Sequence, residues 1–163
     1  MNVIEGTYKK GTRKNVLFLC DTNSVYSPIA EAYLQQMASK KFIAYSAGIY
    51  PKKVHPIIVQ VMKEEGIDLT FSQSKSLFGS ELAFVKFDYV ISFCDPENPT
   101  LQPVFPYKYK KIKWNVRSTF GKQYTDLSSE QAACKTRDQI KASVAEFIEE
   151  QLAMFEECSL QLV

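Results

Sequence analysis

A cysteine stands where an apolar run gives way to a polar loop and then to a helical pattern. Residues 16–19 are wholly apolar, Cys20 follows them, and Ser27 and Pro28 open a stretch whose apolar residues recur at helical spacing. Loop amides and the positive end of a helix attract oxyanions such as phosphate, arsenate or sulfate. The same field stabilises the thiolate, which is the nucleophilic form of a cysteine. We therefore predict an anion-binding loop with Cys20 as its nucleophile.

The elements that position this loop alternate between short apolar runs and helical patterns. Strands are predicted at residues 16–19, 42–46, 89–93 and 111–114. Helices are predicted from Ser27, as the N-terminal cap with Glu31 in the first turn, and over residues 55–65, 77–85 and 128–157. Strands that alternate with helices are typical of an α/β fold. We expect three αβα layers with a central four-stranded parallel sheet.

Length and composition indicate one globular domain. The chain has 163 residues, of which 45% are hydrophobic and 23% are charged. We expect residues 1–14, which are polar and carry lysines, to form a flexible extension, and residues 15–163 to form the single domain. No apolar run approaches the roughly 20 residues of a membrane span, and the N-terminus lacks the apolar core of a signal peptide. A cytoplasmic protein without membrane contact is therefore expected.

Charge and cysteine usage narrow the possible partners. The formal net charge is +2, and the lysine-rich stretch 107–113 is predicted to be solvated surface leading into an edge strand, so no nucleic-acid partner is expected. Cysteines stand singly at positions 20, 94, 134 and 158, without the paired spacing of a zinc site. The one histidine, His55, precedes Pro56 and is expected to cap a helix. We expect neither a metal nor another cofactor.

Blocks of sequence between residues 15 and 155 carry a resemblance to one known family. They are Val16-Leu17-Phe18-Leu19-Cys20 with Asn23, Ser27, Pro28, Ala30 and Glu31 in register, then Tyr45-Ser46-Ala47-Gly48, Val54-His55-Pro56, Val61-Met62-Lys63-Glu64, Gly66-Ile67-Asp68 and Ser74-Lys75-Ser76-Leu77. Together they resemble the low-molecular-weight phosphotyrosine phosphatases and thioredoxin-coupled arsenate reductases, especially the arsenate reductase branch. The resemblance implies that fold, with Cys20 and Ser27 as catalytic residues. It also implies an anion-binding loop of Asp21, Thr22, Asn23, Ser24, Val25 and Tyr26.

Three loop positions depart from the family pattern. Tyr26 stands where the family has an arginine, whose planar guanidinium grips two oxygens of the anion and stabilises the transition state. A tyrosine hydroxyl carries no charge and cannot replace that fork of donors. Thr22 stands where the family usually has glycine, and Val25 where many members have a second cysteine. The resemblance thus implies an anion loop without its main clamp.

The general acid of the family also has no counterpart at its usual place. After Trp114 the chain reads Asn115-Val116-Arg117-Ser118-Thr119, where the family places the aspartate that protonates the leaving group. Asp126 is the nearest acid beyond this stretch, and its spacing does not match. Two interpretations of Arg117 stay open: it faces the anion from the stretch that folds over the loop, or it lies on a solvent-facing loop.

Cys94 follows the third predicted strand at the place of the family's second redox cysteine. No further cysteine occurs in residues 95–106, so a local partner cannot complete the relay of the family, and plain packing is the other interpretation of Cys94. These departures predict a family protein that binds a small oxyanion or phosphorylated ligand, with impaired catalysis and a possible protein partner. The alternative is an active cysteine-dependent phosphatase or arsenate reductase with a rearranged site.

Overall fold

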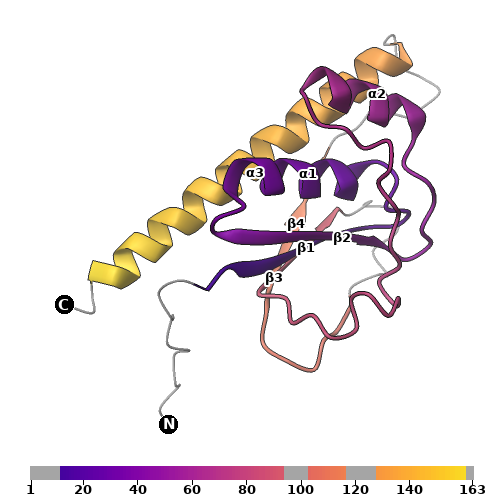
Figure 1. The fold of residues 1–163 in the computed structure, drawn as a ribbon. Coiled ribbons are helices and arrows are strands. Elements are labelled where there is room, and N and C mark those ends of the chain that lie inside the picture. Colours follow the sequence, from indigo (N-terminus) through magenta and orange to yellow (C-terminus); the bar gives the residue numbers. More distant parts are fainter. Residues whose placement is uncertain (1–11, 94–102, 117–127, 161–163) are drawn as a thin grey trace.

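The computed structural model describes residues 12–93, 103–116 and 128–160. Within them the order of elements is β1 (Lys14–Cys20), α1 (Tyr26–Ala38), β2 (Phe42–Gly48), α2 (Pro56–Glu64), β3 (Tyr89–Phe93), β4 (Lys110–Trp114) and α3 (Ser129–Leu160) (Figure 1). The four predicted strands are therefore confirmed. Residues 1–11 lie outside the described residues, so the flexible extension stays a prediction.

The strands form one parallel sheet in the order β2-β1-β3-β4. From β1 the chain turns first to one side, to β2, and later crosses to the other side, to β3. The point between β1 and β3 is therefore a topological switch point, where open α/β sheets bind ligands beyond the carboxyl ends of their strands. Cys20 is the last residue of β1 and pairs with Gly48 at the end of β2. The fold thus places the cysteine at the carboxyl end of β1, where sheets of this kind bind ligands.

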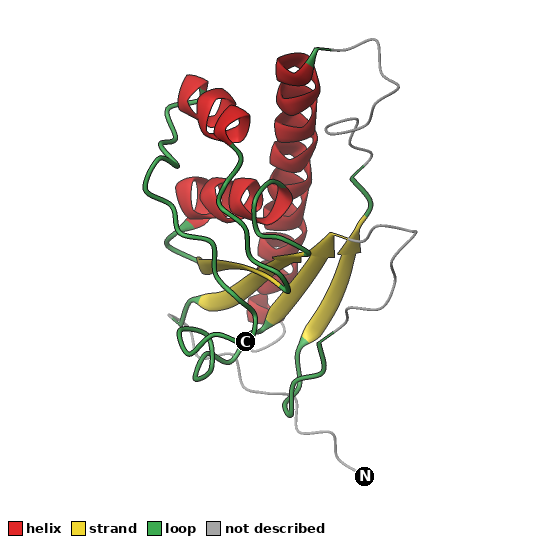
Figure 2. Cartoon of the chain, turned by 90° about the vertical axis from the view of Figure 1, so that its right-hand side faces the viewer, coloured by secondary structure: helices red, strands yellow, loops and turns green. Residues whose placement is uncertain are grey.

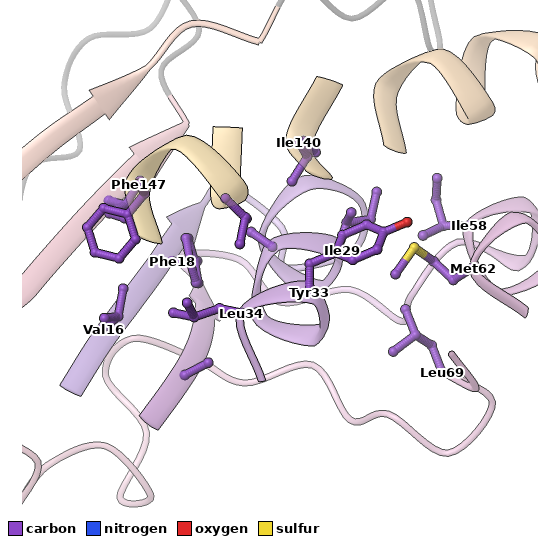
Figure 3. Close-up of a cluster of buried hydrophobic side chains, with 14 of the residues drawn as sticks. Val16, Phe18, Ile29, Tyr33, Leu34, Ile58, Met62, Leu69, Ile140 and Phe147 are labelled. Atoms are coloured by element: carbon purple, nitrogen blue, oxygen red, sulfur yellow. The ribbon is translucent and has the colours of Figure 1, made fainter. Parts of the chain in front are cut away.

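All three helices pack on one face of the sheet (Figure 2). Because side chains alternate along a strand, Val16 and Phe18 of β1 face the helices while Leu17 and Leu19 face the other way. Figure 3 shows the helix-side cluster, in which Phe18 lies among side chains of α1 and α3. Burial on both sides explains why residues 16–19 of β1 are an unbroken apolar run.

The opposite face of the sheet is covered by turns and loops. The helix expected at residues 77–85 is absent: backbone bonds here reach back three residues, from Leu82 to Gly79 and from Val85 to Leu82, as in successive turns. Leu82 and Phe87 nevertheless fill the hydrophobic cluster beneath Leu17 and Leu19. The third layer is thus made of irregular chain in the described residues.

The ends of α2 follow the expected local rules. The His55 side chain accepts a hydrogen bond from the Ile57 amide at 3.3 Å, so its predicted capping role is confirmed. Gly66 follows the helix with a positive φ of 77°, a conformation that glycine adopts without strain.

Among the described residues, no helix combines the length and apolar character needed to cross a bilayer.

Candidate functional site

The loop between β1 and α1 enters its helix differently from the sequence prediction. The helix begins at Tyr26, and Val25 is the N-cap with no side-chain cap bond, so the prediction of Ser27 as the cap is wrong. Ser27 instead lies inside the first turn, fully buried. Its hydroxyl has a different partner, because Ser27 Oγ lies 2.8 Å from Cys20 Sγ. The first turn carries no acidic residue, so Glu31 is not placed as expected either.

Two hydrogen-bonding groups converge on the sulfur of Cys20. Besides Ser27, the backbone N–H of Asn23 donates to Cys20 Sγ at 3.2 Å. Cys20 itself is 6% exposed and is the last residue of β1, directly before the loop. The sulfur thus accepts the Asn23 N–H and shares a hydrogen with the Ser27 hydroxyl, next to the start of α1. Ser27 and Asn23, the predicted catalytic and anion-binding residues, thus lie beside Cys20, and their roles stay predictions.

Asn23 is the centre of the loop. It is the one non-glycine residue of the described chain with a positive φ, at 50°, and it is 1% exposed. Asparagine tolerates this conformation better than most residues. Its side chain donates from Nδ2 to Ser27 Oγ at 2.8 Å and to Ser46 Oγ at 2.9 Å, and its Oδ1 accepts from the Lys75 amide at 2.8 Å. These bonds tie the loop to β2 and to the segment after α2.

The loop carbonyls are held by the segment that follows β2. The amides of Tyr50, Lys52 and His55 donate to the carbonyls of Asp21, Thr22 and Ser24 at 2.8, 2.8 and 3.0 Å, respectively. Carbonyl oxygens would repel an anion, and these bonds engage three of them. The arrangement therefore favours a loop whose remaining polar groups are amide donors.

Gly48 allows the close approach between the loop and β2. A Cβ at this position would lie 2.7 Å from the Asn23 nitrogen and 2.8 Å from the Thr22 carbonyl carbon. Both atoms are backbone, so no side chain can rotate away to make room. Any larger residue here must displace the loop that carries Cys20.

A layer of charged and polar side chains supports the loop. The hydroxyl of Ser46, buried at the end of β2, donates a short hydrogen bond to the Glu31 carboxylate of α1. The same carboxylate pairs with the ammonium of Lys75 at 3.4 Å. The sequence blocks contained Ser46 and Lys75 without marking them as site residues. Only the packing of β2, α1 and the segment after α2 brings them together.

Tyr26 belongs to an aromatic cluster rather than to the sulfur's immediate contacts. Its ring stacks on Phe93 of β3, with centroids 5.7 Å apart and planes at 20°. Phe93 in turn meets the edge of Trp114 at 5.7 Å, and Trp114 contacts Phe18 in the core at 5.6 Å. One wall beside the loop is therefore aromatic and continuous with the hydrophobic core.

Comparison with known families covers nearly the whole chain. The family described as low molecular weight phosphotyrosine protein phosphatase matches residues 15–162. The chain belongs to this family. The expected membership is thus confirmed.

Known proteins resemble this family member in sequence and structure. Arsenate reductase 1 of Staphylococcus epidermidis is 30% identical over 135 residues, covering 83% of this chain and 96% of that protein. A low molecular weight protein tyrosine phosphatase from T. tengcongensis has a TM-score of 0.62 at 24% identity and covers 84% of this chain and 99% of its own. A thioredoxin-dependent arsenate reductase of Corynebacterium glutamicum reaches 0.67 at 22% identity, covering 89% of this chain, which spans 65% of that protein. The two structures confirm the expected α/β fold.

Tyr26 has no charge, so the charge that the family arginine brings to the loop would have to come from another arginine of this family member. Arg137 of α3 forms hydrogen bonds with residues outside the loop. Its Nη1 donates to the Val61 carbonyl at 2.8 Å, and its Nε donates to Asp138 at 2.8 Å. Arg13 contacts the Ser39 carbonyl at 3.5 Å on the surface. Neither of the two arginines in the described residues reaches the Cys20 loop. Arg117 lies outside the described residues.

Two further cysteines lie within the described residues, both of them away from the loop in α3. Cys134 is half-buried and Cys158 is exposed. Burial raises the pKa of the Cys134 thiol, which opposes thiolate formation there. Cys94 lies outside the described residues, so its predicted redox role stays a prediction. In the part of the chain that the structure describes, no three histidine, cysteine, aspartate or glutamate side chains gather as metal ligands.

Proposed function

We propose that the chain is a family member that binds a small oxyanion or a phosphorylated ligand in the Cys20 loop and turns it over poorly or not at all. The observation that carries the proposal is the convergence of the Asn23 amide and the Ser27 hydroxyl on Cys20 Sγ, at 3.2 and 2.8 Å. A loop built in this way at a helix start suits an anion and a thiolate.

The expected weakness of catalysis rests on what the site lacks. Tyr26 supplies no charge and stacks on Phe93, and neither described arginine reaches the loop. No aspartate stands at the family position after Trp114. Loss of one preorganised donor to a transition state typically costs about 10² to 10³ in rate, and here two catalytic groups are affected. The proposal therefore combines binding with impaired turnover.

Isothermal titration calorimetry with inorganic phosphate and with arsenate tests the binding. We expect binding by the wild type, loss of binding in Asn23→Ala, and retention in Asn15→Ala, which removes a matched side chain at the opposite end of β1. The proposal is overturned if neither phosphate nor arsenate produces heat on titration into the wild type.

The same titration of Arg117→Ala tests the predicted contribution of Arg117 to anion binding. Equal affinities of this variant and the wild type would exclude that contribution.

The alternative is an active enzyme with a rearranged site, of the kind that two relatives are named for. The Staphylococcus epidermidis relative is an arsenate reductase, and the Corynebacterium glutamicum one is thioredoxin-dependent. Activity of that kind in this chain would require a reducing protein partner and a second cysteine, for which Cys94 is the candidate. Arsenate reduction coupled to a thioredoxin system and abolished by Cys20→Ser would establish this alternative.

A further inference from the structure

The face of the sheet opposite the helices carries two lysines of β4. In the register of the parallel strands β3 and β4, Val90 lies opposite Lys111. Ser92 lies opposite Lys113, two residues further along both strands. Because side chains alternate along a strand, Lys111 and Lys113 share one face, while Ile112 between them packs against the helix-side core. The two lysines therefore stand on the face that lacks helices, beside Val90 of the second hydrophobic cluster.

These lysines, two side chains of β3 and the chain that leads into β4 form a hollow. It has a volume of about 260 Å³, including its open mouth, and it is lined by Val90, Ser92, Pro103, Tyr109, Lys111 and Lys113. Sites for drug-sized ligands measure roughly 300 to 1,000 Å³, so this hollow suits a smaller ligand of about one ring.

The ring of Tyr109 is an apolar wall of the hollow and is held from several sides. Its hydroxyl donates to the Pro103 carbonyl at 2.8 Å, and its ring meets that of Phe105 edge to face, with centroids 5.3 Å apart. The ammonium of Lys111 lies 5.6 Å from the centroid of the same ring, as in a cation–π contact. A positive charge thus lies directly beside a preformed apolar wall, an arrangement that lowers the cost of ordering a ligand.

The lysines around the hollow have no carboxylate partner in the described residues. None of the ion pairs there includes Lys111 or Lys113, nor their neighbours Lys108 and Lys110. Four lysines within the six residues 108–113 repel one another, and an anion placed among them relieves that repulsion. A ligand that supplies a negative charge therefore fits this part of the sheet.

We propose that the hollow is a second ligand site of the molecule, which binds a small organic carboxylate that carries an aromatic ring. The ring covers Val90, Pro103 and Tyr109, and the carboxylate lies between the ammonium groups of Lys111 and Lys113. An inorganic oxyanion would satisfy the lysines but would leave the apolar wall in water. None of the lining residues belongs to the Cys20 loop, so the site goes beyond the proposed function.

The test is a titration of ¹⁵N-labelled protein with phenylacetate, followed by the amide signals in NMR spectra. Phenylacetate should shift the signals of Ser92, Lys111 and Lys113 saturably, with a dissociation constant on the order of 1 mM for a ligand of this size. Acetate lacks the ring, and 2-phenylethylamine carries the opposite charge. Each should bind at least about tenfold more weakly, because it loses either the apolar or the ionic contacts.

Substitutions distinguish a built site from a diffuse attraction of anions to a basic surface. Lys111→Met and Lys113→Met should each weaken phenylacetate binding by about threefold, the effect of one lost charge pair at an exposed position. Lys108→Met is the matched control. It removes the same charge from the same stretch, but Lys108 does not line the hollow, so the affinity should stay within about 1.5-fold of wild type.

Three results would overturn the inference: no saturable shift in the wild type, shifts centred on Asn23 and Ser27 of the loop, or equal losses of affinity in Lys108→Met and Lys113→Met. Thermal melting identifies a variant that fails to fold, and the comparison of the three ligands on the wild type then decides.

Titration with inorganic phosphate is read separately and concerns the Cys20 loop. Lys111→Met should bind phosphate as the wild type does, and a loss in this variant would contradict two separate sites. Phenylacetate binding without phosphate binding refutes the proposed function alone. Phosphate binding without phenylacetate binding refutes this inference alone.

Discussion

Tyr26 occupies the position at which the family resemblance expects an arginine, and its stacking on Phe93 gives the residue a structural role of its own. Stacked aromatic pairs contribute about 0.5 to 1.5 kcal/mol beyond their buried area. The side chain therefore closes one wall of the loop with an apolar surface instead of a charge. From this exchange we expect a stable loop with a weaker grip on anions.

A first prediction follows from restoring the charge. Tyr26→Arg should raise phosphate affinity by about tenfold, because a bidentate guanidinium adds charge-assisted hydrogen bonds. Hydrolysis of p-nitrophenyl phosphate, whose leaving group needs little protonation, should rise with it. Hydrolysis of phenyl phosphate should stay low, since the general acid is still missing. The matched variant Tyr50→Arg, at an exposed site, should alter neither the phosphate affinity nor the rate of hydrolysis. Hydrolysis by the wild type that Cys20→Ser abolishes would contradict the premise that catalysis is impaired without the arginine.

Tyr33 gives a second prediction at the scale of a residue. It is fully buried on α1, and among the described residues its hydroxyl has no hydrogen-bond partner (Figure 3). Burial, together with the nearby Glu65 carboxylate, raises the pKa of Tyr33 to about 12 from 10.0. A raised pKa means that its contribution to stability is present below pH 10 and is lost as pH rises toward 12.

Tyr33→Phe should therefore leave the free energy of unfolding at pH 7 unchanged or raise it by about 1 kcal/mol, since an unsatisfied hydroxyl is removed from the core. Above pH 10 the variant should lose stability less steeply than the wild type. Urea unfolding at pH 7, 10 and 11.5 measures both effects. A loss above about 1 kcal/mol at pH 7 would mean that the hydroxyl has a partner.

At the scale of elements, most of the fold could be predicted, because the spacing of apolar residues in strands and helices and the residue types at helix ends are local features of the sequence. Strand β1 and the cap at His55 follow from runs and residue types alone. The segment 77–85 misled the prediction because Leu77, Leu82 and Val85 pack into the second cluster from successive turns, a spacing that periodicity cannot distinguish from a short helix. Ser46 and Lys75 were missed as site residues because their role depends on tertiary contacts that no spacing reveals.

The junction of α2 and α3 gives a prediction at the same scale. Arg137 is 8% exposed and donates to the Val61 carbonyl near the end of α2, where helix carbonyls lack intrahelical partners. It also pairs with Glu64 at 3.3 Å. Arg137→Met should lower the free energy of unfolding by about 3 kcal/mol, because the carbonyl and carboxylate lose a buried cation. Arg13→Met, at the surface, should cost less than about 0.5 kcal/mol by the same urea titration.

At the scale of the whole molecule, the sheet is covered by regular helices on one face and by turns on the other. The second cluster joins Leu17, Leu19 and Val90 of the strands to Leu82 and Phe87 of the irregular segment. The Phe87 ring meets Tyr45 and Phe105, each with centroids 5.6 Å away. Such contacts make the irregular segment part of the core. They also keep β1 buried on the side opposite the helices, and Cys20 stands at the end of that strand.

The last prediction tests whether the irregular layer supports the fold. Phe87→Ala should lower the free energy of unfolding by about 3 to 5 kcal/mol, because it leaves a cavity among Leu17, Tyr45 and Phe105. Phe84→Ala is the matched control: it removes the same side chain from the same segment, but Phe84 is 96% exposed and the change should cost less than about 0.5 kcal/mol. Equal effects of the two substitutions in urea unfolding would contradict a packed third layer. If the layer also holds β1 in place, Phe87→Ala should accelerate alkylation of the buried Cys20, because local opening of the sheet becomes more frequent as stability falls.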